Sequence, residues 1–526
     1  MTNLILNIDC GTVDWSRAQF AITAIYHWLF VPLTLGLAVI MGIVETKYYR
    51  TRDDFWKRAA QFWQRLFGIN FAMGVATGII LEFEFGTNWS NYSWFVGDIF
   101  GAPLAVEGIV AFFMESTFVA VMYFGWKKVS PGFHLASTWL TGLGATISAW
   151  WILVANAWMQ YPVGCAFNPD TMRNEMVSFA DVALSPFAVD KFFHTVISSW
   201  IIGAVFCVAV CCWYLMKKRE TRLATESMKI GVWVGLIAAL LAGATGHKSA
   251  QSVSEVQPMK LAAMEALYDG GTAQGLKIIE GIEVPYALSF MATNDFQGYV
   301  PGINDILNGY TRADGTQEPS VDEKIARGKQ AIAALAAYRK AKAEGADEET
   351  INAQLSILNA NMQYFGYGYI KDKEDVVPPI AVNFWAFRIM VGLGCVFILY
   401  FIVLLLMVYD VPFLSIFTRR LLATIGLLPE TAADAKGITG LPDWHYWAAI
   451  LLVPLAYIAS ECGWLVAEFG RQPWTIQDML PTWASVSDLN ASSVALTFFL
   501  FLALFSTMLA VEINILLKQI KKGPEK

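Results

Sequence analysis

The strongest constraint on this chain is a series of apolar stretches, each about 20 residues long or longer. A helix of about 20 apolar residues crosses the hydrocarbon core of a bilayer. Of the 526 residues, 56% are hydrophobic and only 15% are charged, whereas soluble proteins carry about 25% charged residues. We therefore predict an all-α integral membrane protein with about nine transmembrane helices, near residues 20–46, 60–84, 101–126, 133–158, 191–217, 228–247, 381–409, 444–467 and 493–519.

The positions of Lys and Arg predict the orientation of these helices. Positive side chains gather in the cytoplasmic connections of membrane proteins. Here they follow the odd-numbered helices and fill the C-terminal tail, as at Lys47, Lys127, Lys217 and Lys518, whereas the connection 85–100 has none. We therefore expect the N-terminus outside and the C-terminus in the cytoplasm.

The chain divides into two predicted membrane bundles and one large polar loop. The first bundle takes residues 1–247 with six helices, and the second takes residues 381–526 with three. Residues 248–380 form an extracytoplasmic loop under this orientation. Within the loop, VDEKIARGKQAIAALAAYRKAKAE (321–344) has an apolar stripe and i,i+4 charge pairs, which predict an amphipathic helix. This helix would either cap the membrane part or contribute to substrate binding.

Several common functions lack their sequence signatures. The seven cysteines form no C-x-x-C pair, which argues against thiol-bound zinc, iron–sulfur clusters and covalently attached haem. Lys and Arg do not form a basic patch, so we expect no nucleic acid partner. The Gly-rich segments GLGATIS (142–148) and GATGHKS (243–249) lack the spacing of nucleotide-binding loops. These absences direct attention to polar side chains inside the membrane.

A small set of such side chains lies near the outer ends of the predicted helices. Ionisable groups are costly inside a membrane, so they are functional candidates. Imidazole and thioether groups bind haem iron, a His/Met pair favours a low-spin haem, and a single His or a carboxylate leaves a position open for O2. Hydrogen-bonded interior histidines and a core-filling methionine are the alternative interpretation. The set comprises His27, Glu107, His194, Arg388, Met390 and Glu468.

The number of histidines limits the kind of redox centre. The chain has five, namely His27, His134, His194, His247 and His445. A haem–copper centre with a second bis-His haem needs about six, most of them in the middle of the membrane. We therefore expect no copper, and haem ligation here must include Met and carboxylate partners.

Two pairs of charged residues indicate proton chemistry. Glu107 and Glu115 are eight residues apart, which in an α-helix separates them by about 12 Å along the axis and about 80° around it. Glu115, followed by Ser116, would lie deeper, so the two carboxyls suit a proton relay, or each is neutralised by a neighbouring helix. Lys260 and Glu265, at the base of the loop, would bind and deprotonate a phenolic substrate or lie on a solvated helix face.

Seven longer stretches carry a family resemblance. They are SRAQFAITAIYHWLFVPLTLG (16–36), FGINFAMGVATGIILEFEFGTNWSNYSWFVGDIFGAPLAVEGIVAFFMESTF (67–118), WILVANAWMQYPVG (151–164), KFFHTV (191–196), VQPMKLAAMEA (256–266), FWAFRIMVG (384–392) and ECGWLVAEFGRQPW (461–474). Over nearly its whole length the sequence resembles subunit I of cytochrome bd-type quinol oxidases. The length of the polar loop resembles the long form of the quinol loop in that family.

The resemblance implies three haems and a set of residues around them. His194 and Met390 match the axial ligands of a low-spin haem b. His27 and Glu468 match the groups at the other two haems, a high-spin haem b and haem d. The further matches are Glu107 as the acid beside haem d, Glu115 as the next group on the proton route, Lys260 and Glu265 as quinol contacts, Arg388 and Arg471 as partners of haem propionates or reduced haem charge, and Trp464 as an aromatic packed among the haems.

The resemblance also implies an activity. It predicts a multi-pass terminal oxidase subunit of the bacterial cytoplasmic (inner) membrane, which oxidises ubiquinol or menaquinol at the outer face and reduces O2 to water. This reaction would generate proton motive force without proton pumping. A second membrane subunit and a small single-span subunit would be its partners in the lipid bilayer. The alternatives are a haem-free secondary transporter or channel that uses the intramembrane glutamates, and a haem-bearing quinol dehydrogenase without an oxygen site.

Overall fold

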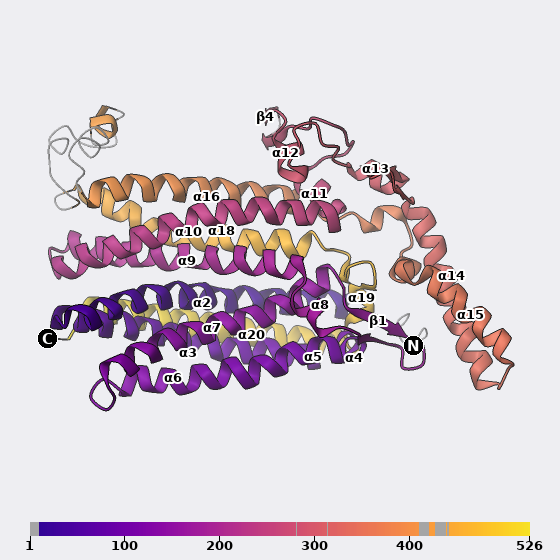
Figure 1. Ribbon diagram of the computed structural model, residues 1–526, viewed down its shortest axis with the longest axis horizontal. Coiled ribbons are helices and arrows are strands. Elements are labelled where there is room, and N and C mark those ends of the chain that lie inside the picture. Colours follow the sequence, from indigo (N-terminus) through magenta and orange to yellow (C-terminus); the bar gives the residue numbers. More distant parts are fainter. Residues whose placement is uncertain are drawn as a thin grey trace.

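A computed structural model shows long helices that run side by side as one bundle (Figure 1). The structure describes residues 10–279, 281–312, 314–409, 420–424, 426, 438 and 441–525. Nine helical segments within them are long and apolar enough to cross a membrane, which confirms the all-α membrane fold. They are α2 (Cys10–Thr51), α3 (Asp54–Thr87), α5–η1–α6 (Gly97–Val106, Glu107–Phe112 and Phe113–Phe124), α7 (Pro131–Gln160), α9 (Pro186–Met216), α10 (Thr221–Val256), α16 (Ile380–Val408), α18 (Asp443–Phe469) and α20 (Ala491–Lys522).

Helix α2 lies at the centre of the bundle. Helix α2 packs against α3, α7, α9 and α20. Gly36 of α2 and Gly203 of α9 face each other so closely that a Cβ on Gly36 would lie 2.6 Å from the Cα of Gly203. Small residues allow membrane helices to approach in this way. The contact fixes α2 beside α9, and these are the two helices that carry His27 and His194.

Local sequence explains where several helices begin. Pro131 and Pro186 each occupy the first helical position, where the missing N–H costs nothing. The serine before each proline caps the helix, because Ser130 Oγ accepts from the N–H of residue 133 and Ser185 Oγ accepts from the N–H of residue 188.

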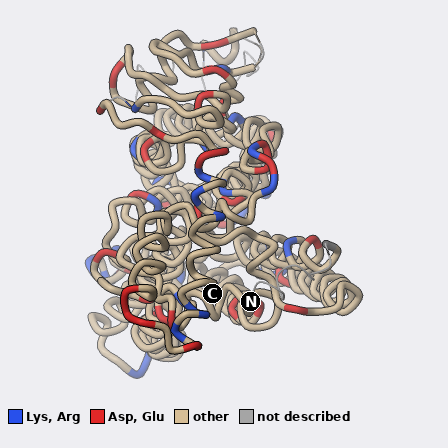
Figure 2. The backbone as a smooth tube through the Cα atoms, turned by 90° about the vertical axis from the view of Figure 1, so that its right-hand side faces the viewer, with Lys and Arg blue, Asp and Glu red and all other residues tan. Residues whose placement is uncertain are grey.

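One end of the bundle carries the long loop between α10 and α16, and we call it the loop end. Figure 2 views the molecule from this end and shows charged residues as short interruptions in an otherwise uncharged chain. Four two-stranded antiparallel hairpins also belong to the described residues. The short elements are α4 (Ser90–Phe95), β1 (Cys165–Asn168), β2 (Arg173–Met176), α8 (Phe179–Ala183), α11 (Pro258–Glu265), β3 (Leu276–Ile279), β4 (Ile282–Val284), α12 (Ala287–Thr293), α13 (Ile303–Asn308), β5 (Tyr310–Thr311), β6 (Gln317–Glu318), α14 (Val321–Ala343), α15 (Glu348–Asn361), η2 (Met362–Tyr369), η3 (Lys373–Val376), β7 (Trp474–Ile476), β8 (Leu480–Pro481) and α19 (Thr482–Ser485).

The predicted amphipathic helix of the loop is confirmed as α14, and it pairs with α15 (Figure 1). This helix pair is fastened to the β1–β2 hairpin. Lys342 Nζ lies 2.6 Å from Asp170 Oδ1, and the Tyr338 hydroxyl donates to the same oxygen at 2.9 Å. The rings of Phe167 and Phe365 stack with centroids 5.7 Å apart. The loop is therefore tied to the segment between α7 and α9 as well as to the helices that it connects.

Two helices differ from their sequence-based prediction. The sixth span continues as α10 to Val256, so the helix passes the predicted domain boundary at residue 247. The third span is not a regular α-helix, because residues Glu107–Phe112 form a π-helical segment, with i→i+5 hydrogen bonding. The straight α-helix assumed between Glu107 and Glu115 is therefore wrong.

Candidate functional site

Two histidines on different helices are held in the same way. His27 Nδ1 on α2 lies 3.0 Å from Thr77 Oγ1 on α3, and His194 Nδ1 on α9 lies 3.2 Å from Thr245 Oγ1 on α10. Each threonine hydroxyl donates its own proton to the carbonyl four residues earlier in its helix, at 3.0 Å for Thr77 and 2.9 Å for Thr245. The hydroxyl oxygen is then the acceptor for the histidine.

This arrangement fixes the tautomer of both imidazoles. An Nδ1 that faces an accepting oxygen carries the hydrogen, so the neutral ring has its lone pair on Nε2. Metal-ligating histidines usually donate their second N–H to a neighbouring acceptor in this way. His27 and His194 are therefore both left with a lone pair on Nε2, the form in which an imidazole can bind a metal ion.

A short sequence triplet creates this environment twice. Ala-Thr-Gly occurs at 76–78 and again at 244–246. A Cβ on Gly78 would lie 3.0 Å from His27 Cε1, and a Cβ on Gly246 would lie 3.1 Å from His194 Cε1. The threonine thus binds each ring while the glycine leaves space for it. The second triplet lies inside GATGHKS, the segment excluded above as a nucleotide-binding loop.

Met390 and Trp464 lie where α16, α18 and α2 meet. Met390 Sδ would be 3.2 Å from a Cβ on Gly463 of α18. The neighbouring Trp464 forms an edge-to-face pair with Trp28 of α2, with centroids 5.2 Å apart. Trp28 Nε1 donates to Ser460 Oγ at 2.7 Å, which fixes this ring. The thioether and the aromatic expected at the redox centre are therefore on the adjoining helices α16 and α18.

Glu468 lies at the centre of a charged network at the loop end. Its Oε2 accepts from Arg471 Nη2 at 2.5 Å, and its Oε1 accepts from Asn156 Nδ2 at 3.0 Å. Asn156 in turn accepts a hydrogen bond from Lys191, whose ammonium lies 5.4 Å from the ring centroid of Trp464. Residues of α7, α9 and α18 thus converge on one carboxylate.

Lys260 extends this network toward the loop. Its ammonium donates to Gln160 and to Gln257, the latter at 2.7 Å. Lys260 is only 3% exposed, so the solvated helix face considered above is wrong. Burial lowers the pKa of Lys260 well below its usual value, and the positive charge of Lys191 lowers it further.

Positive charge exceeds negative charge in this cluster. Lys191, Lys260 and Arg471 surround the single carboxylate of Glu468. Within the described residues, Arg471 Nε and Nη1 are buried and have no hydrogen-bond partner. Buried charges and polar groups are normally paired. The cluster therefore fits a ligand that brings carboxylates of its own, and a haem does so through its two propionates.

Arg388 forms a separate buried ion pair with Glu265 beneath the β3–β4 hairpin. Arg388 Nη2 lies 2.6 Å from Glu265 Oε2, and Nη1 lies 3.2 Å from Oε1. The guanidinium also donates to the carbonyls of Met264 and Lys277. Unlike Arg471, Arg388 therefore uses every donor nitrogen within the protein, so a propionate would have to displace one of these partners.

The carboxyl group of Glu265 is shielded from solvent although it is paired with Arg388. Its side chain is 1% exposed. Burial raises its pKa to about 7, although the hydrogen bonds and the charge of Arg388 act in the opposite direction. A carboxyl group with this pKa can accept and release a proton near neutral pH. The solvated face is wrong for Glu265 as well.

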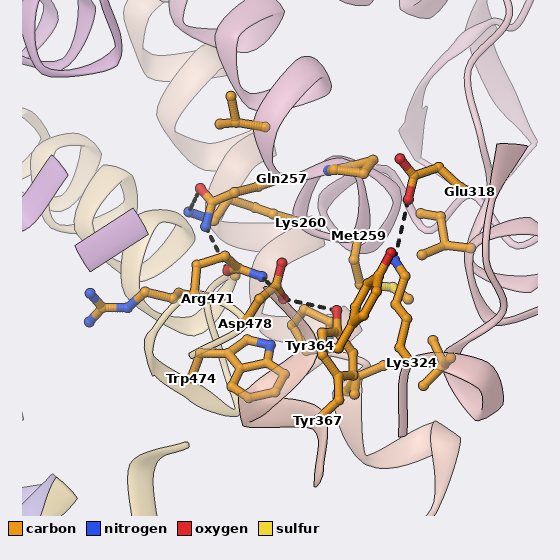
Figure 3. A pocket seen from close by; sticks show the side chains of 18 of the residues that line it. Gln257, Met259, Lys260, Glu318, Lys324, Tyr364, Tyr367, Arg471, Trp474 and Asp478 are labelled. Carbon is orange, nitrogen blue, oxygen red and sulfur yellow. Dashed lines mark hydrogen bonds and ion pairs between the residues drawn. The ribbon is translucent and has the colours of Figure 1, made fainter. Parts of the chain in front are cut away.

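A cavity of about 290 Å³ lies beside Lys260 (Figure 3). Gln257, Lys260 and Arg471 line one side of it, and Tyr364 and Tyr367 of η2 line the other. A chain of hydrogen bonds follows its wall, running from Lys260 through Gln257, Gln477 and Asp478 to the Tyr367 hydroxyl. Burial, reinforced by the Asp478 carboxylate, raises the pKa of Tyr367 well above its usual value, so the phenol remains a donor at neutral pH.

The two glutamates of the third span both face α7. Ser148 Oγ of α7 donates to Glu107 Oε1 at 2.5 Å, and a Cβ on Gly144 would lie 2.7 Å from Glu115 Cγ. The π-helical segment explains this alignment. It accommodates one extra residue, so Glu107 and Glu115, eight residues apart, are rotated relative to each other as if they were seven residues apart in an α-helix. Seven residues at about 100° each give about 700°, which is within about 20° of two full turns. Ser116 is exposed, and its hydroxyl donates to the carbonyl of Phe113.

Several residues of the site were not predicted from the sequence. The sequence does not reveal that Lys191, the amides that connect it to Lys260 and Lys260 itself form one group, because these residues are far apart in the chain. Lys191 itself offered a signal, since a lysine three residues before His194 in an apolar span is costly unless it has a partner. The other unpredicted residues are Thr77, Thr245, Asn156, Gln160, Gln257, Gln477 and Asp478.

The fold and the site together define a multi-pass membrane protein with two threonine-bound histidines in its spans and a buried cationic cluster at the loop end, a combination typical of membrane redox proteins. More specifically, the chain belongs to the cytochrome bd terminal oxidase subunit I family, whose family model matches residues 15–524. The family resemblance is thereby confirmed. Members of this family are subunits of oxidoreductases that act as terminal oxidases.

Individual relatives agree with this assignment. The chain is 37% identical to cytochrome bd-II ubiquinol oxidase subunit 1 of Escherichia coli (strain K12), with 97% of each protein covered. It is 34% identical to cytochrome bd ubiquinol oxidase subunit 1 of Bacillus subtilis (strain 168), covering 97% of this chain and 94% of the relative. The bd oxidase structure from Geobacillus thermodenitrificans has the same fold, with a TM-score of 0.71 at 20% identity over 98% of this chain and 99% of that one.

Proposed function

We propose that this chain is the haem-bearing subunit of a quinol oxidase that reduces O2 to water through a low-spin haem b, a high-spin haem b and haem d. The observation that carries the proposal is the matched pair of partly buried histidines within the spans, each with Nδ1 bound to threonine and an unprotonated Nε2. The haems supply the redox chemistry, and the protein supplies ligands, charge and proton transfer.

The residues of the chain fall into distinct roles around these haems. His194 and Met390 would hold the low-spin haem b, and His27 and Glu468 would serve the two high-spin haems. The unpartnered nitrogens of Arg471 would bind propionates, with Lys191 balancing the remaining negative charge. No copper takes part.

Two groups at the loop end could take protons from a quinol. Burial lowers the pKa of Lys260, which makes its ammonium easier to deprotonate, and the cavity beside it has donors and acceptors for a polar head group. Glu265 is the second candidate, since its pKa of about 7 allows it to cycle between protonation states. Ubiquinol or menaquinol would be the substrate.

Proton uptake for water formation would come from the opposite end of the bundle. Glu115 and then Glu107, both against α7, would pass these protons toward the oxygen site. With the N-terminus outside and the C-terminus in the cytoplasm, the protons of the quinol would be released outside the cell. The protons consumed in water formation would be taken up from the cytoplasm. This separation would build proton motive force without pumping. We place the protein in the bacterial cytoplasmic membrane with a second membrane subunit and a small single-span subunit.

The test is a reduced-minus-oxidised optical spectrum of the purified complex. Three haem contributions are expected, whereas a colourless protein would favour a haem-free transporter. Met390→Leu should remove the low-spin contribution. Met264→Leu is the matched control, because Met264 is buried in the same apolar cluster and is not a proposed ligand. Equal spectra for the two variants would contradict the assignment of Met390.

A further inference from the structure

The segment that follows α11 exposes an unusual number of large apolar side chains. Ile282 at the tip of the β3–β4 hairpin is 55% exposed, and Phe296 beyond α12 is 57% exposed. Phe290 and Phe296 stack with centroids 4.6 Å apart, so the exposed aromatics form a fixed surface. We call this surface the hairpin patch, and it consists of Tyr268, Ile278, Ile279, Ile282, Val284, Tyr286, Phe290 and Phe296.

The contacts of this segment place it beside α16. Arg388 donates two hydrogen bonds to the carbonyl of Lys277 in β3, at 2.9 and 2.6 Å. Leu288 and Ala292 of α12 are buried in the same apolar cluster as Phe387 of α16. Figure 1 shows β4 and α12 at the side of the bundle near this end of α16, whereas α14 and α15 extend beyond the bundle.

Arg388 gives the depth of the hairpin. It is eight residues from the start of α16, which corresponds to about 12 Å along the axis. The 29 residues of α16 are about 43 Å long, which matches the hydrocarbon core plus both headgroup layers of a bilayer, about 40–45 Å. Since the hydrocarbon core is about 30 Å thick, each headgroup layer is about 6 Å thick, and the Cα of Arg388 lies about 6 Å inside the core. Its side chain points back toward the start of the helix and reaches the carbonyl of Lys277, so the backbone of β3 lies close to the boundary between headgroups and acyl chains.

The hairpin patch continues the lipid-facing surface of α16. Val382, Trp385 and Ile389 of that helix are exposed at the same levels. A two-stranded hairpin has unpaired edges and cannot enter the hydrocarbon core, but interfacial elements bury their apolar face at the boundary of headgroups and acyl chains. Tyrosine and other aromatic residues are typical of this layer.

We propose that the hairpin patch is seated in the headgroup layer of the leaflet at the loop end, with phospholipid as its contact. The lipid then covers the apolar residues, and Lys277 and Arg388 hold the hairpin at that depth. As a result, the β3–β4 hairpin separates the Glu265–Arg388 ion pair from the lipid. The proposal rests on the membrane fold and not on haem ligation.

The depth can be measured with a fluorophore on single introduced cysteines. Cys395 is the exposed native cysteine among those whose side chains the structure describes, so Cys395→Ser provides the parent. Ile282→Cys and Phe296→Cys place the nitrobenzoxadiazole label in the patch. Ile357→Cys on α15 is the matched control, because Ile357 is 44% exposed on the helix pair beyond the bundle. The labelled parent gives the background of the remaining cysteines.

The labelled holoenzyme is placed in nanodiscs of phosphatidylcholine, with and without nitroxide lipid, and compared with aqueous iodide as quencher. We expect nitroxide lipid to reduce emission at 282 and 296 but not at 357, and iodide to act mainly at 357. Quenching of all three positions by iodide alone would overturn the proposal. So would protection of 282 and 296 from both quenchers, since that result would mean that a protein subunit covers the patch.

Discussion

Replacing Thr245 by Val tests how the chain holds the ligand of its proposed low-spin haem. Valine keeps the shape of threonine but removes the oxygen that accepts from His194 Nδ1 at 3.2 Å. The N–H then keeps only its interaction with the carbonyl of Ala242, and the loss of one hydrogen bond costs about 0.5–1.5 kcal/mol. That loss corresponds to roughly 2- to 13-fold weaker haem retention, near the lower end of the 10- to 100-fold effects typical of such outer partners.

The control for this experiment is Thr245→Ser, which keeps the hydroxyl. Haem content per polypeptide and the midpoint potential of the low-spin haem would be measured on both purified variants. Thr77→Val provides an internal comparison, because it removes the same bond from His27 and should alter a high-spin haem instead. If Thr245→Val kept the low-spin haem content and potential of Thr245→Ser, the tautomer argument for His194 would be refuted.

Three further predictions concern proton transfer. Lys260→Met should lower quinol oxidation about tenfold or more, in line with about 1.5–3 kcal/mol for charged hydrogen bonds, while haem content is unchanged; wild-type kinetics would remove Lys260 from the substrate site. In the wild type, kcat/KM for quinol should fall as the pH drops below about 7, because Glu265 becomes protonated and cannot accept a proton. Glu265→Gln should abolish this decrease at acidic pH. If the decrease remained in that variant, another group would be responsible for it. Glu115→Gln should slow steady-state O2 consumption but leave haem reduction by quinol intact, and stopped-flow reduction slowed to the same degree would argue against the relay.

The membrane helices were predictable because lipid imposes a simple rule on sequence. Each span must be apolar for about 20 residues, and this pattern located all nine within the described chain. An apolar stretch predicts which residues lie in the lipid, but it does not predict where the helix itself ends. Residues 248–256 are polar and were assigned to the loop, yet α10 continues through them because their backbone hydrogen bonds do not depend on lipid.

The site was predictable as residue types but not as partnerships. His27, His194 and Glu468 stand out because polar groups are rare in apolar spans. The burial of Lys260 did not stand out, because it depends on Gln160 and on charges from α9 and α18 that only the fold brings together. The sequence analysis also gave Arg388 and Arg471 the same role. In the structure, every guanidinium nitrogen of Arg388 has a hydrogen-bond partner, whereas two nitrogens of Arg471 have none.

The π-helical segment Glu107–Phe112 accommodates one surplus residue in the third span. With that residue, Glu107 and Glu115 both lie against α7. Removing one residue, for example Gly108, would let the span relax into a continuous α-helix in which the two glutamates are seven residues apart, or about 700°, so both would still lie against α7. Straightening the span with every residue kept would instead turn Glu115 by about 100° toward another neighbour. The alignment of the two carboxyls therefore depends on the π-helical turn, and a single-codon deletion within that turn should preserve it.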